Sequence, residues 1–176
     1  MKYFYLLLVC LVSIPRAAAQ DATIFDLARS GTTDQVKSLL KSDPKLVNAT
    51  NPEGYSPLTL AVYRSNNAVA KFLVENGAAI DAVSGMGTAL MAAVVKGNDE
   101  MVQYLLEKKA NPNLTDANGE TALLYSVMFK KHGPAAWLMK AGANAEHKDN
   151  RGQSAIDYAI LANDDKLIEI LKTKKL

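Results

Sequence analysis

The sequence predicts an all-α solenoid of about five stacked helix-turn-helix units with short loops between them. Two observations predict it: a repeat of fixed period, and apolar residues at helical spacing inside each unit. Four segments of the chain align on a hydroxyl residue. These residues, which are 32, 33 and 33 positions apart, are Ser56, Thr88, Thr121 and Ser154. A period of this size indicates a stack of similar units rather than an ordinary globular domain.

Each unit is predicted to contain two short helices. The hydroxyl residue caps the first helix, because its side-chain oxygen accepts a hydrogen bond from a free backbone N–H in the first turn. A turn leads to a second apolar stretch, and a return segment rich in Gly or Asn follows. These second stretches begin at Val69, Met101, Pro134 and Leu167. One such pair has too little apolar surface to fold alone, so neighbouring pairs must stack.

The first nineteen residues are predicted to be a signal peptide. Lys2 gives a basic start, residues 3–14 form an apolar run, and Pro15 precedes the small residues Ala17, Ala18 and Ala19. This order is typical of a segment that signal peptidase removes, and we expect cleavage between Ala19 and Gln20. The mature chain would then be periplasmic or secreted, with no membrane insertion after cleavage.

Two alternatives for this segment fit less well. A membrane anchor needs about 20 apolar residues, and the run is shorter. A lipid anchor through Cys10 would need a small residue before the cysteine, where Val9 stands. Because Cys10 is the only cysteine, the mature chain would contain no disulfide and would depend on packing alone.

The aligned segments resemble the ankyrin repeat. The run Ser56-Pro57-Leu58-Thr59-Leu60-Ala61 partly matches the family signature Thr-Pro-Leu-His-x-Ala, and the segments at Thr88 and Thr121 match it more loosely. The Gly-Ala-Asp turn of the family is echoed at Gly77 and at Gly142. The chain is also similar to exported, periplasmic bacterial members of the family. The resemblance implies an ankyrin-repeat solenoid over essentially all of the mature chain, with short loop fingers.

The predicted units divide the chain into six parts. They are the signal peptide (1–19), an N-terminal capping repeat (20–50), three ankyrin repeats (51–82, 83–115 and 116–148) and a C-terminal capping repeat (149–176). The third unit is one residue short in its loop, at residues 82–87. In the fourth, Lys130 stands where Gly31 and Gly97 stand elsewhere, at a position that favours a left-handed backbone. Either that turn is remodelled or it carries strain of about 1 kcal/mol, and Pro134 is expected to open the second helix.

The sequence contains no recognisable catalytic set, cofactor motif or metal-ligand motif, so we expect no enzyme, no cofactor and no metal site. His132 and His147 fall in predicted turns and are interpreted as surface residues. Asp164 and Asp165 are interpreted as caps of the last helix rather than metal ligands. Trp137 is interpreted as core, because it aligns with Phe72 and Tyr104. The triplets at Asn48 and Asn113 match the glycosylation pattern, but they are interpreted as turn asparagines.

The charge of the mature chain argues against nucleic acid as a partner. Without Lys2 and Arg16 the 20 basic residues fall to 18, which equals the number of acidic ones. Phosphate binding needs a concentrated basic face instead. The densest basic cluster, at residues 172–175, is interpreted as a solvated helix end.

The resemblance implies where a partner protein would bind. The loop tips before each first helix act as fingers, and the C-terminal ends of the first helices line a palm. The expected finger residues are Glu53, Tyr55, Met86, Asn118, Glu120, Arg151 and Gln153. The expected palm residues are Arg29, Tyr63, Arg64, Val95, Lys96, Met128, Phe129 and Leu161. The apolar palm residues are expected to form a nearly continuous strip beside Arg64 and Lys96, unless some turn inward to fill gaps.

The resemblance also implies the class of function. The leading hypothesis is an exported protein-binding module that sequesters a toxic effector, as some exported bacterial ankyrin-like proteins of this size do. The alternative is an accessory protein that supports an exported enzyme, for example in peroxide defence. We expect the free chain to be monomeric and its partner, effector or exported enzyme, to be another protein.

Overall fold

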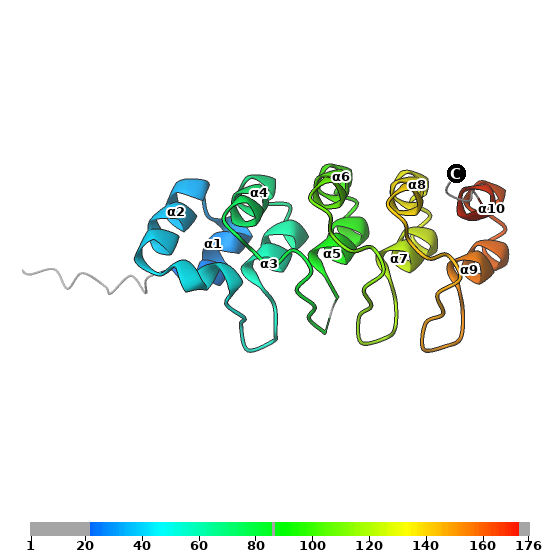
Figure 1. Ribbon diagram of the computed structural model, residues 1–176, viewed down its shortest axis with the longest axis horizontal. Helices are drawn as coiled ribbons and strands as arrows, with labels where there is room; N and C mark the ends of the chain where they lie inside the picture. The colour runs from blue at the N-terminus through cyan, green and yellow to red at the C-terminus, as the bar shows by residue number, and fades with distance from the viewer. Residues whose placement is uncertain (1–21, 86, 173–176) are drawn as a thin grey trace, which may run out of the picture.

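The computed structural model describes residues 22–85 and 87–172, so the predicted signal peptide lies outside the described residues. The described chain folds into ten α-helices and one short 3-10 helix, and the α-helices stack as five pairs along one axis (Figure 1). The predicted all-α solenoid is confirmed.

The helices form two layers, with one helix of each pair in each layer. The first helices form the inner layer, next to the loops that hang below the stack in Figure 1: α1 (Ile24–Ser30), α3 (Pro57–Tyr63), α5 (Ala89–Lys96), α7 (Ala122–Met128) and α9 (Ala155–Leu161). The second helices form the outer layer: α2 (Thr33–Ser42), α4 (Asn67–Glu75), α6 (Asp99–Glu107), α8 (His132–Lys140) and α10 (Asp165–Lys172). The 3-10 helix η1 (Pro44–Asn48) follows α2. Each inner helix packs on the next inner helix, which fixes the order of the loops.

The repeated hydroxyl residues start the inner helices, as the sequence predicts. The Thr121 hydroxyl accepts a hydrogen bond from the backbone N–H of Leu124 at 3.2 Å. Equivalent bonds, accepted by the Ser56, Thr88 and Ser154 hydroxyls, cap α3, α5 and α9. Each bond satisfies a donor that the helix itself leaves free, so the cap defines where the loop ends and the helix begins.

The core lies between the two layers and runs through all five pairs. Its largest members include Leu73, Leu105 and Leu138, one from each of three successive outer helices, and all three are fully buried. Trp137 belongs to this core only in part. Like Phe72 and Tyr104, it is half-buried and packs against the core from the outer side. The helix phase expected from the sequence is therefore right, but these aromatic rings lie at the edge of the core.

Two asparagines join one repeat to the next. The Asn48 side chain donates to the Gly77 carbonyl at 3.0 Å and accepts from the Ala79 N–H at 2.7 Å. Asn113 makes the same pair of bonds with Gly142 and Asn144. Both side chains thus bind the glycine turn of the following repeat.

The turn at Lys130 keeps the left-handed geometry of the turn at Gly97, so the turn is not remodelled. Lys130 is left-handed with φ 52°, close to Gly97 at 65°, and strain at a side-chain-bearing residue is the remaining alternative. The helix α8 begins at His132, so Pro134 is its third residue and not its first. Gly31 differs from the others, because its backbone is extended and a Cβ there would lie 2.7 Å from the Leu27 Cα.

Within residues 22–85 and 87–172, none of the helices has the length and apolar character needed to span a membrane.

Candidate functional site

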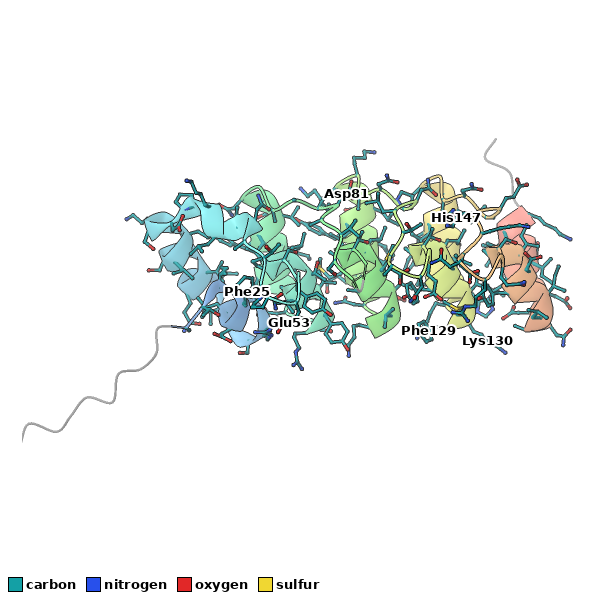
Figure 2. The ribbon with its side chains drawn as sticks, turned by 90° about the horizontal axis from the view of Figure 1, so that it is seen from below. Phe25, Glu53, Asp81, Phe129, Lys130 and His147 are labelled. Atoms are coloured by element: carbon teal, nitrogen blue, oxygen red, sulfur yellow. The ribbon has the colours of Figure 1, made fainter. Side chains whose placement is uncertain are left out.

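The concave side of the stack contains a groove of about 470 Å³ between the loop fingers and the inner helices α3, α5 and α7. Its walls come from the first four helix pairs and include both loop residues and helix ends. The lining residues are Arg29, Asn51, Glu53, Tyr55, Thr59, Leu60, Tyr63, Arg64, Gly85, Ala92, Val95, Asp116, Asn118, Tyr125 and Phe129. Figure 2 shows that Glu53 and Phe129 lie toward the same long edge of the stack, opposite Asp81 and His147.

Apolar side chains in this groove are open to solvent. Phe129 is 49% exposed and Val95 is 38% exposed. The Phe129 ring stacks on the Tyr125 ring, with centroids 6.2 Å apart and planes within 7°. Tyr63 is half-buried and packs against the core. Exposed apolar and aromatic groups in a concave surface are typical of interaction sites.

Cations stand along the helix ends beside these rings. Arg64 and Lys96 follow one another in the inner layer, and the Lys96 ammonium lies 4.9 Å from the centre of the Tyr63 ring. Among the described residues, neither Arg64 nor Lys96 has a carboxylate within ion-pair distance. Arg29 has a weak intrahelical pair with Asp26 at 3.4 Å. The groove therefore has cationic groups that are available to a bound anion.

The fourth finger is fixed by a buried carboxylate and a tyrosine. Asp116 accepts hydrogen bonds from the backbone N–H groups of Asn118 and Glu120, both at 2.9 Å. The Tyr125 hydroxyl donates to the other Asp116 oxygen at 2.6 Å. Burial raises the pKa of Tyr125 well above its usual range, and the bonds to Asp116 and Glu120 add to this. The hydroxyl therefore keeps its proton and holds the finger against α7.

The fifth finger repeats this arrangement 33 residues later. Asp149 accepts from the N–H groups of Arg151 and Gln153, and the Tyr158 hydroxyl donates to it at 2.6 Å. The Tyr158 bond, with help from the two N–H groups and the Arg151 charge, lowers the pKa of Asp149 although burial opposes the shift. We call each such pair, Asp116 with Tyr125 and Asp149 with Tyr158, a finger latch.

The last two fingers also bind to each other. The Arg151 guanidinium donates to the Glu120 carboxylate at 2.7 Å, and His147 Nε2 lies 2.9 Å from the Gly119 carbonyl oxygen. The Asn150 N–H donates to the Asn118 carbonyl at 3.0 Å. These contacts make the loops of the fourth and fifth repeats one connected unit.

Eight of the fifteen expected finger and palm residues line the groove, and five of them are Tyr55, Tyr63, Arg64, Val95 and Phe129. Lys96 lies beside it on the Tyr63 ring. Arg29, Glu53 and Asn118, also named among the finger and palm residues, line it as well. The sequence pattern thus located the groove through the ends of the inner helices.

The other expected residues do not join this groove. Glu120 was expected at an exposed tip, but only 4% of it is exposed, because its carboxylate turns inward to Arg151. Arg151 is exposed but bound in that pair. Met128 is half-buried and outside the lining, and Leu161, 71% exposed, lies at the end of α9 beyond it. Two members of the expected strip, Met128 and Leu161, thus lie outside the groove, and Met86 lies outside the described residues.

Several lining residues were missed by the sequence analysis, notably Leu60, Ala92, Asp116 and Tyr125. A usable signal exists for the last two: an Asp followed nine residues later by a Tyr occurs twice, 33 residues apart. Leu60 and Ala92 carry no such signal. They matter because they are smaller than the tyrosine of the later repeats.

The polar groups outside the groove have structural roles. Asp164 caps α10 by accepting from the Leu167 N–H at 3.0 Å, as expected. His132 belongs to the first turn of α8 and not to the preceding loop, and its Nε2 lies 3.0 Å from both Asp164 oxygens. The backbone bond from Leu167 and then the His132 contact lower the pKa of Asp164. Over the described ranges, no group of three or more His, Cys, Asp or Glu side chains is arranged to hold a metal ion.

Comparisons with known proteins agree with this architecture. A family profile described as ankyrin repeats (three copies) matches residues 24–116. The chain is 38% identical over 120 residues to an ankyrin repeat-containing protein of Treponema pallidum, covering 67% of this chain and 40% of that protein. It is 39% identical over 136 residues to the ankyrin repeat and SAM domain-containing protein 6 of Rattus norvegicus, covering 74% of this chain and 15% of that protein. The chain thus spans less than half of the length of these relatives.

Proposed function

The chain belongs to the ankyrin-repeat family, and from that premise we propose that it is a non-catalytic module that binds another protein in its concave groove. The observation that carries the proposal is the exposed apolar lining of the groove next to Arg64 and Lys96, which have no carboxylate within ion-pair distance among the described residues. A bound partner would bury Phe129 and Val95 away from water, which is favourable, and its carboxylates would give Arg64 a counter-ion. An apolar centre beside charged groups is the usual anatomy of a protein interface.

The finer part of the proposal concerns place and partner. The predicted signal peptide favours a role outside the cytoplasm, in the periplasm or beyond the cell. There we propose that the chain acts as an immunity protein that sequesters a toxic effector. The family resemblance supports an inhibitor that works by occupation. The same groove would also serve an accessory protein of an exported enzyme, and the identity of the partner separates the two.

Affinity capture from the producing cell tests the binding role. The variant Tyr63→Ala with Phe129→Ala removes two aromatic rings from the groove. The matched control, Phe72→Ala with Tyr104→Ala, removes the same two ring types from the outer helices. We expect the groove variant to lose at least about 2 kcal/mol of binding free energy, roughly thirtyfold in affinity, and the control to capture the partner as the parent does. Equal capture by all three proteins would overturn the proposal.

The captured partner then tests the finer role. An effector that kills cells lacking this chain, and that loses its toxicity when the chain is supplied, supports the immunity role. A resident enzyme that stays active in the complex supports the accessory role instead. For export, intact-mass analysis of the recovered protein is expected to give a chain that begins at Gln20, and a chain that begins at Met1 would contradict it.

A further inference from the structure

One position of the inner helices differs between the repeats in a way that opens the groove. Tyr125 and Tyr158 occupy equivalent places, nine residues after the aspartate of each finger latch. The aligned residues of the two preceding repeats are Ala92 and Leu60. Both of these line the groove. The third repeat therefore omits the side chain with which the fourth and fifth fill the space between helix and finger.

The finger of the third repeat is reduced as well. Its backbone closes between Ser84 and Gly87, whereas the next finger closes between Asp116 and Glu120, one residue farther apart. Ser84 uses its hydroxyl locally, donating to the Gly87 carbonyl at 3.0 Å. This finger thus has neither the carboxylate nor the phenol of a latch. We call the space lined by Leu60, Gly85 and Ala92 the hollow.

Aromatic groups stand on either side of the hollow along the stack. Tyr63 comes from the preceding repeat, and the stacked pair of Tyr125 and Phe129 comes from the following one. Aromatic rings pack well against other rings in offset or edge contacts, and they dominate the centres of protein interfaces. An aromatic side chain of a partner fits the hollow, because the fourth and fifth repeats place their own rings, Tyr125 and Tyr158, at the equivalent position.

The charges beside the hollow are positive. Arg64 and Lys96 occupy the helix-end position that Phe129 takes in the following repeat. Neither has a carboxylate partner among residues 22–85 and 87–172, as described above. Glu53 is the one exposed carboxylate of the groove lining, since Asp116 is buried in its latch. A carboxylate that enters next to the ring would find both cations available.

We propose that the groove binds an extended segment of a partner protein that presents an aromatic side chain beside a carboxylate. The ring lies over Ala92, where the later repeats place Tyr125 and Tyr158, and the carboxylate pairs with Arg64 and Lys96. This inference rests on the proposed function and specifies the chemistry of the segment that the groove accepts.

Three defined peptides test it by nuclear magnetic resonance titration of the ¹⁵N-labelled full chain. They are acetylated, amidated pentapeptides with the sequences Gly-Glu-Tyr-Glu-Gly, Gly-Glu-Ala-Glu-Gly and Gly-Lys-Tyr-Lys-Gly. The first is expected to shift the amides of Gly85, Ala92 and Val95 saturably. The second and third should bind at least tenfold more weakly. Equal binding of all three, or shifts confined to the outer helices, would overturn the inference. Shifts of the same amides on raising the chain concentration without peptide would mean that a second copy is the occupant, which would also overturn it.

The variant Ala92→Tyr fills the hollow with the side chain that the chain uses in its own next repeats. It is expected to weaken binding of the Gly-Glu-Tyr-Glu-Gly peptide at least tenfold. Its control is Ala136→Tyr, the same change at an exposed position of the outer helix α8, which should leave binding unchanged. If Ala92→Tyr does not fold, Arg64→Gln with Lys96→Gln decides, because both positions are exposed. This variant must then lose the preference for the glutamate peptide over the lysine peptide, and a preserved preference contradicts the inference.

Capture of the natural partner by these variants distinguishes the binding groove from the aromatic segment proposed to occupy it. Capture that survives Ala92→Tyr but fails with Tyr63→Ala and Phe129→Ala would refute the aromatic segment and leave the binding groove intact. Capture that survives both changes would refute the groove itself.

Discussion

The fourth and fifth repeats bridge inner helix and finger with a tyrosine, whereas the second and third carry Leu60 and Ala92 at that position. In the former, the two finger latches and the contacts between Arg151 and Glu120 hold helix and loops together. Among the described residues of the third finger, Ser84 and Gly87 close the loop on itself. The outer layer there is joined by polar contacts, since the Glu100 carboxylate accepts from Lys71 at 2.6 Å and from Asn67 at 2.7 Å.

The difference shows how a repeat protein can acquire a site without changing its fold. The inner helices of all five pairs form one row, each packed on the next (Figure 1). The presence or absence of a tyrosine at one position of the inner helix decides whether the chain itself fills the space under the finger. Where Leu60 and Ala92 replace that tyrosine, an apolar groove is left for another molecule.

The largest loss of stability is expected from substitutions in the core, where the two regions are alike. Leu105 and Leu138 are fully buried in the third and fourth outer helices. Leu105→Ala and Leu138→Ala should each lower the free energy of unfolding by about 2 to 5 kcal/mol, because each leaves a cavity in the core. Chemical denaturation measures both. A loss below about 0.5 kcal/mol at either site would mean that the two regions differ in their core and not only on the concave side.

The next largest loss of stability should differ between the fourth finger and the third. Asp116→Ala leaves the Tyr125 hydroxyl and the backbone N–H groups of Asn118 and Glu120 without their acceptor. We expect a loss of about 1 to 3 kcal/mol in the free energy of unfolding. Ser84→Ala, the corresponding change in the open finger, removes one local bond and should cost less than about 1 kcal/mol. Equal losses in denaturation experiments would show that the latch adds nothing.

The latches also predict how stability depends on pH. The folded pKa of Asp149 lies below its ordinary value of 3.8. The stabilisation is therefore complete above that ordinary value and is lost as the pH falls through the lowered one. Asp149→Asn copies Asn51, which accepts from the Tyr55 N–H in the second finger. Denaturation midpoints at pH 5 and pH 3 should differ less for this variant than for the parent. Parallel losses would contradict a role of Asp149 in acid sensitivity.

The smallest effect concerns the turn at Lys130. A left-handed backbone costs a side-chain-bearing residue about 1 to 2 kcal/mol, but glycine loses roughly 0.5 to 1 kcal/mol more in chain entropy on folding. Lys130→Gly should therefore stabilise the chain by up to about 1 kcal/mol, and Gly97→Lys should destabilise it by a similar amount. Thermal unfolding checks both signs. A destabilised Lys130→Gly variant would mean that the lysine side chain contributes more than the strain removes.

The fold could be predicted from the sequence because the same cap and helix patterns recur in successive repeats. The caps at Ser56, Thr88, Thr121 and Ser154 and the helix phase of Leu105 and Leu138 are local patterns, and each was read correctly. The half-burial of Trp137 was not predictable from its alignment with Phe72 and Tyr104, since the alignment gives the face of the helix and not the depth to which it is covered.

The groove was predicted only in part, because its shape depends on contacts between repeats. The Glu120 carboxylate turns inward because Arg151, 31 residues away, reaches it, and no local pattern shows this. The pattern within a single repeat does not indicate Ala92 or Leu60, because their importance lies in the side chain they lack. The comparison of aligned positions with Tyr125 and Tyr158 would have shown it.

Hydrogen–deuterium exchange of the chain with and without its captured partner tests the central claim most directly. If the partner occupies the groove, protection should appear in the fingers and inner-helix ends of the second to fourth repeats, around Tyr63, Ala92 and Phe129. The outer helices α2, α4, α6, α8 and α10 should exchange as in the free chain. Protection of the outer helices, with unchanged exchange around Ala92, would contradict the account.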